Sequence, residues 1–102
     1  MKNHSLEKEL ERNNVKLVQQ MIMNVLDRIR IKDSWYKRRP SERMIKKKEA
    51  SIDELGPWLE TDSAKFWFRM YGNCTGKNGD RMLDNFKEIA LSTIKFLEDI
   101  KS

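Results

Sequence analysis

The scarcity of helix-breaking residues constrains the fold of this chain most. Its 102 residues include only four glycines and two prolines, and three of the glycines lie between Gly72 and Gly79. Glycine and proline interrupt helices more strongly than any other residues, so long stretches on both sides of that loop can stay helical. We therefore expect an all-α protein that forms a single small domain, residues 1–102, of four to five helices.

Apolar residues recur at helical spacing near both ends of the chain. The first helix is expected from about Ser5 to about Lys32, and after its polar first third the apolar residues repeat every three or four positions, as on one face of a helix. The members of this stripe are Val15, Val18, Ile22, Val25 and Ile29. A second stripe, between about Asp80 and Lys101, comprises Leu83, Phe86, Ala90, Thr93, Leu97 and Ile100. We expect these long first and last helices to pack antiparallel, with an aromatic third helix between or across them.

The middle of the chain predicts shorter elements. Proline disfavours helical backbone at the residue before it, so Pro40 indicates a turn or extended link over residues 33–40. Ser41 can then cap a helix over Glu42–Ala50, and the capping-box spacing of Ser51–Glu54 indicates a separate helical turn.

A third, aromatic helix is expected over Ser63–Tyr71. Thr61 or Asp62 can cap its beginning, and Gly72 with Asn73 suits a left-handed cap at its end.

The positive charge of the chain is concentrated in residues 28–48. Ten basic residues against two acidic ones give this segment a formal charge of +8, whereas the other 81 residues sum to −3. Cationic side chains displace the counterions condensed on nucleic acids, and aromatic rings can stack on bases. A basic segment that also contains Trp35 and Tyr36 is therefore typical of a nucleic-acid-binding surface.

We predict a small regulatory protein that contacts DNA or RNA mainly through phosphates, with little base readout. The predicted binding residues are Trp35, Tyr36, Lys37, Arg38, Arg39, Arg43, Lys46, Lys47 and Lys48. The same charges are also compatible with a solvated surface that binds nothing, or with an acidic protein or membrane surface. The competing function is a helical protein-interaction module, such as an inhibitor or adaptor on a larger protein, whose apolar helix faces could also mediate self-association.

The sequence offers little for catalysis or metal binding. Cys74 is the only cysteine and His4 the only histidine, too few for a structural zinc site and without a pattern for a nucleophile and its base. We expect no enzyme activity, no cofactor and no metal. The lone cysteine, together with the lack of an apolar run of signal-peptide or membrane-span length, predicts a cytoplasmic protein without a membrane partner.

Overall fold

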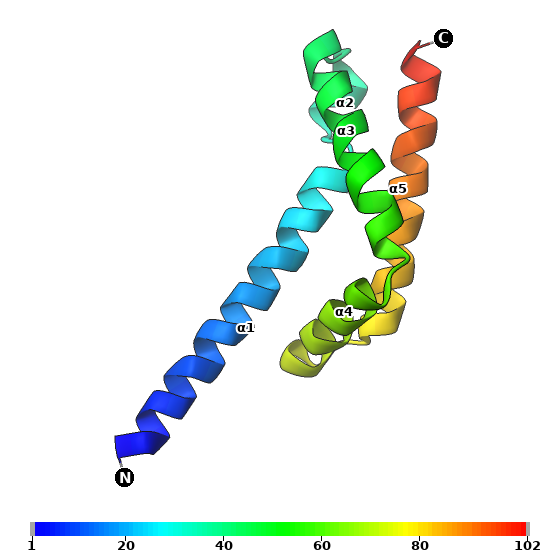
Figure 1. The fold of residues 1–102 in the computed structure, drawn as a ribbon. Helices are drawn as coiled ribbons and strands as arrows, with labels where there is room; N and C mark the ends of the chain where they lie inside the picture. Colours follow the sequence, from blue (N-terminus) through cyan, green and yellow to red (C-terminus); the bar gives the residue numbers. More distant parts are fainter. Residues whose placement is uncertain (1, 102) are drawn as a thin grey trace.

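The computed structural model describes the backbone of residues 2–101 and the side chains of residues 14–101. Within this range the helices are α1 (Lys2–Ile29), α2 (Ser34–Lys37), α3 (Glu42–Leu59), α4 (Asp62–Thr75) and α5 (Gly79–Lys101). No residue of 2–101 belongs to a strand, so the all-α prediction is confirmed (Figure 1). None of these helices combines the length and the apolar composition that crossing a membrane requires.

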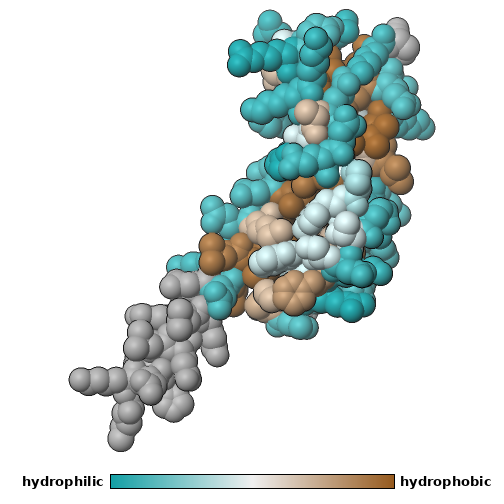
Figure 2. Space-filling view, viewed as in Figure 1, coloured by the Kyte–Doolittle hydropathy of each residue, from teal (hydrophilic) through white to brown (hydrophobic). Residues whose placement is uncertain are grey.

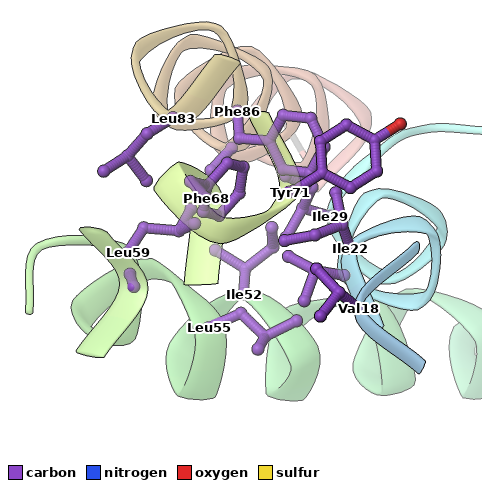
Figure 3. Packing of buried hydrophobic residues seen from close by; sticks show 13 residues of the cluster. Val18, Ile22, Ile29, Ile52, Leu55, Leu59, Phe68, Tyr71, Leu83 and Phe86 are labelled. Carbon is purple, nitrogen blue, oxygen red and sulfur yellow. The ribbon is translucent and has the colours of Figure 1, made fainter. Parts of the chain in front are cut away.

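The hydrophobic core lies where α1, α3, α4 and α5 meet (Figure 3). The predicted stripe of the first helix is confirmed over its buried members, Val18, Ile22, Val25 and Ile29. At the centre, the ring of Phe68 on α4 packs edge-on against Phe86 on α5, with centroids 4.8 Å apart. Full burial of an apolar side chain of this size contributes roughly 1.5–3 kcal/mol, so this cluster is the main stabilising feature of the fold.

Helix α3 is longer than the sequence predicts. It passes without interruption through Gly56 and Pro57 to Leu59, so the separation into Glu42–Ala50 and Ser51–Glu54 was wrong. Proline removes one backbone hydrogen bond, but Pro57 lies in the last turn, and Gly56 has no Cβ to collide with the proline ring. Leu59, 1% exposed, fixes this last turn in the core.

The beginning of α4 agrees with the prediction and its end does not. The hydroxyl oxygen of Thr61 accepts a hydrogen bond from the backbone nitrogen of Ala64 at 3.3 Å, as expected for a cap. The helix continues to Thr75 and ends at Gly76, whose φ of 72° is left-handed. The predicted cap, Gly72, lies within α4 instead. It is buried because the backbone of Lys77 and Gly79 passes through the space that a Cβ would occupy.

Helices α3 and α5 are antiparallel. The ammonium of Lys87 lies 3.4 Å from the carboxylate of Glu60, and that of Lys101 lies 2.7 Å from Glu49. Later residues of α5 therefore meet earlier residues of α3.

Helix α1 is also antiparallel to α3, because Arg28 pairs with Glu54 at 2.7 Å while Leu17 and Trp58 line one groove. Because α1 and α5 are each antiparallel to α3, they run in roughly the same direction as each other, as Figure 1 shows. The antiparallel arrangement predicted for the first and last helices was therefore wrong. The chain reverses between α1 and α3 and again between α3 and α5, and two reversals restore the original direction. The first part of α1 extends beyond the other helices (Figure 1).

Candidate nucleic-acid interface

The later half of the basic segment lies at one end of the molecule. There α2 and the start of α3 lie beside the C-terminal part of α5 (Figure 1). A second apolar cluster, separate from the main core, holds these elements together. Its buried members are Trp35, Ile45 and Leu97, against which Ile31, Phe96 and Ile100 pack. The charged residues of this end are therefore carried on a packed framework.

The structure places Trp35 inside this framework. Its side chain is only 7% exposed, and its indole nitrogen is buried with no hydrogen-bond partner among the described residues. The single turn of α2 turns the ring inward, toward Ile45 and Leu97. Trp35 therefore has no free face for a base, contrary to the stacking role predicted for it.

Lys48 is also turned inward. Its ammonium donates hydrogen bonds to the backbone carbonyls of Asp27 and Arg28, each at 3.1 Å, and lies 5.9 Å from the centre of the Trp35 ring. Burial lowers the pKa of Lys48, and the positive charge of Lys32 lowers it further. The last carbonyls of a helix lack partners within it, so Lys48 caps the end of α1 and is not available to bind phosphate.

The cations of α3 that remain exposed share one face. Arg43 and Lys47, four positions apart, lie opposite the buried residues Ile45 and Ile52, and Lys46 lies at the edge of the same exposed face. Within residues 14–101, none of these three cations has a carboxylate within ion-pair distance. Their charge is therefore directed to the solvent without neutralisation.

Three further cations adjoin this face. Lys37 ends α2, while Arg38 and Arg39 occupy the link to α3, and all three are exposed. Arg39 lies 3.7 Å from Glu42, but both side chains are more than half exposed, so this ion pair is weak. We call the six exposed cations the basic end: Lys37, Arg38, Arg39, Arg43, Lys46 and Lys47.

Tyr36 is the one predicted aromatic residue that reaches the surface, with 66% of its side chain exposed. Its ring packs edge-on against Phe96 of α5, with centroids 5.1 Å apart and an angle of 67° between the ring planes. Tyr36 therefore lies beside the basic end in a fixed orientation.

The first part of the basic segment is partly neutralised. Arg28 pairs with Glu54, and Arg30 lies 3.6 Å from Asp27. Two of the three cations before α2 are therefore paired, whereas among the exposed cations of residues 37–47 only Arg39 has a carboxylate partner within the described side chains.

The sequence did not predict an open groove between α1 and α3. It has a volume of about 530 Å³, and its apolar walls include Leu17 and Met21 of α1 and Leu55 and Trp58 of α3. Leu17 is 61% exposed. Leu17 and Met21, four positions apart and beside the main stripe, were the available sequence signal for this second apolar face.

Figure 2 contrasts the two surfaces. Hydrophilic side chains cover the end formed by α2 and the start of α3, while apolar side chains gather where α1 leaves the other helices. Among the described side chains, no group of three or more His, Cys, Asp or Glu residues could hold a metal ion.

Comparison of the chain with protein-family models, with curated proteins and with solved structures found no match.

Proposed function

We propose that this protein is a small, non-enzymatic regulatory protein that binds nucleic acid through the basic end. The observation that carries the proposal is the exposed face of α3, where Arg43, Lys46 and Lys47 have no ion-pair partner among the side chains of residues 14–101. Lys37, Arg38 and Arg39 extend the same positive charge from the adjoining link. Each cation that neutralises a phosphate releases condensed counterions, so such a surface binds phosphate backbones without reading their sequence.

A cytoplasmic location is part of the proposal. Cys74 is exposed and is a free thiol, which suits a reducing compartment.

The test is fluorescence anisotropy with labelled DNA and RNA of mixed sequence, about 20 nucleotides long, at salt concentrations from about 50 to 300 mM. The variant replaces Arg43, Lys46 and Lys47 together with glutamine. A matched control replaces Lys16, Lys65 and Lys77, which are exposed on α1, α4 and the loop before α5. Both variants lose the same charge, so only the location of the loss differs.

We expect the wild type to bind with a steep salt dependence. Loss of three phosphate contacts should reduce the slope of log K against log salt by about 2 to 3 for the Arg43 variant, while the control stays close to the wild type. Equal weakening of both variants would show that only net charge matters. Absence of binding by the wild type at the lowest salt concentration would contradict the proposal outright.

A second candidate function, a protein-interaction module, is favoured by the groove between α1 and α3. The groove extends along α1 from Leu17 to Arg28, about three helical turns, a length suited to an amphipathic helix of a partner protein. Its test places a photo-crosslinking residue at Leu17 and, as a control, at Leu91, which is similarly exposed but lies outside this groove.

This candidate predicts one protein crosslinked from position 17 alone. The purified protein should then bind the wild type and fail to bind Leu17→Asp. Equal crosslinking from both positions would contradict it.

A further inference from the structure

The surface around the basic end has few groups that could stack on bases. Trp35 is 7% exposed, and one face of its ring lies under the Lys48 ammonium. Proteins that bind single strands without sequence preference combine a positive groove with several aromatic rings on which successive bases stack. With Trp35 in the interior, this source of affinity is greatly reduced.

Tyr36 is the one aromatic residue of residues 28–48 that remains exposed. Its packing against Phe96 fixes the ring plane and covers part of the ring. A single fixed ring can stack on at most one base. The free energy gained from that one contact is small compared with the entropy lost when a flexible strand is ordered.

The cations, in contrast, belong to a well-fixed part of the fold. The hydroxyl oxygen of Ser41 accepts a hydrogen bond from the backbone nitrogen of Met44 at 3.3 Å, which fixes the start of α3. Pro40 and Ile45 are buried beneath the link and the first turn, and Lys48 ties the next turn to the end of α1. The backbone positions that carry Arg43 and Lys47 are therefore set one turn apart, about 6 Å along the helix axis.

The phosphates of a double helix are also regularly spaced, like the cations on α3. Duplex DNA carries one negative charge for roughly each 1.7 Å of its axis, with bases paired and unavailable for stacking. Two ordered surfaces associate with little loss of chain entropy, whereas a single strand must be ordered during binding.

On the basis of the function proposed above, we infer that the ligand is a double-stranded nucleic acid, contacted through its phosphates by the basic end. Duplex DNA and duplex RNA share this chemistry. The side chain of Tyr36 lies at the margin of the contact and contributes little to the affinity.

The experiment measures binding of the full-length protein to four probes of one sequence: duplex DNA, duplex RNA and the two corresponding single strands without self-structure. We expect at least one duplex to bind about tenfold or more tightly than its single strand near 100 mM salt. Six phosphate contacts give an upper limit of about 5 for the salt slope on a duplex. Tyr36→Ala should change duplex affinity less than about twofold, with circular dichroism confirming that the variant is folded.

Equal or tighter binding of both single strands would overturn the inference while leaving nucleic-acid binding intact. A loss of about fivefold or more for Tyr36→Ala, the range typical of base stacking, would also overturn it. Absence of binding to all four probes would instead refute the function on which the inference depends.

Discussion

The ammonium of Lys48 lies 5.9 Å from the centre of the Trp35 ring and, at the same time, donates hydrogen bonds to two carbonyls at the end of α1. One lysine thus joins α3 to the end of α1 and covers the ring of Trp35, one of the two aromatic residues of α2. The two side chains removed from the predicted binding surface therefore contribute to holding the basic end against the rest of the fold, together with Ile45 and Leu97.

Lys48→Ala is expected to lower the free energy of unfolding by about 1–3 kcal/mol, because it removes two hydrogen bonds and leaves the carbonyls of Asp27 and Arg28 without their partner. The matched control is Lys47→Ala, an exposed neighbour of the same charge, for which we expect a change within about 0.5 kcal/mol. Urea denaturation measures both. Equal effects of the two substitutions would show that Lys48 contributes only its charge.

Lys48 should also give the stability a specific pH dependence. Burial lowers its pKa in the folded state below the ordinary value of 10.5, so near and below that pH the unfolded chain binds more protons than the folded one. Stability contributed by this group therefore rises with pH between the folded and unfolded pKa values. The free energy of unfolding of the wild type, minus that of Lys48→Met, should increase as the pH approaches 10.5. A difference that falls over this range would contradict the inward, desolvated placement of Lys48.

Ser41 allows helix capping and surface charge to be separated. Ser41→Ala should lower the free energy of unfolding by about 0.5–2 kcal/mol through loss of the cap on α3, whereas Ser41→Asp preserves a capping oxygen and should retain most of the stability. Ser92→Ala, at an exposed position within α5, is the control for loss of a hydroxyl group. If the proposed function is correct, Ser41→Asp should still weaken nucleic-acid binding, because it adds a negative charge beside Arg39 and Arg43. Thermal denaturation and anisotropy together measure the two effects.

The junction between α4 and α5 should tolerate no side chain at Gly72. A Cβ there would lie 2.5 Å from the backbone oxygen of Lys77 and 2.8 Å from the backbone nitrogen of Gly79, so Gly72→Ala forces the loop to move. Overpacking of this kind typically costs 1–3 kcal/mol or more. At Gly76 nothing lies within 4 Å, and Gly76→Ala should cost only about 1 kcal/mol for its left-handed backbone. Chemical denaturation should therefore rank Gly72→Ala as the more damaging change, and the reverse order would contradict the close approach at Gly72.

Local sequence rules predicted many of the helical elements correctly. The apolar spacing of α1 and α5 identified their buried faces, since positions three and four apart lie on one side of a helix. Ser41 was predicted as a cap, and Thr61 was one of two candidates, because a side-chain oxygen at the start of a helix satisfies a free backbone N–H.

The errors concern positions at which local preference and tertiary packing disagree. Pro57 and Gly72 are helix breakers by propensity, yet α3 and α4 continue through them because buried neighbours and a close backbone approach favour the helix. The same limit applies to the binding surface. Helical spacing places Lys48, but not Lys46 or Lys47, on the face of Ile45 and Ile52. A lysine is buried on that face only because the carbonyls of Asp27 and Arg28, from a distant helix, accept hydrogen bonds from its ammonium.

By itself, the sequence determined that the chain is helical, which residues share a helix face, and that its positive charge is confined to one segment. The tertiary structure decided the direction of α1 relative to α5, and which members of the basic segment face solvent. Those outcomes depend on contacts between distant residues, such as the Lys48 ammonium with the Asp27 carbonyl, 21 positions away, and the Thr93 hydroxyl with the Ile29 carbonyl, 64 positions away. Helical periodicity specifies which side chains lie together on a face, but only packing against another element determines whether that face is buried.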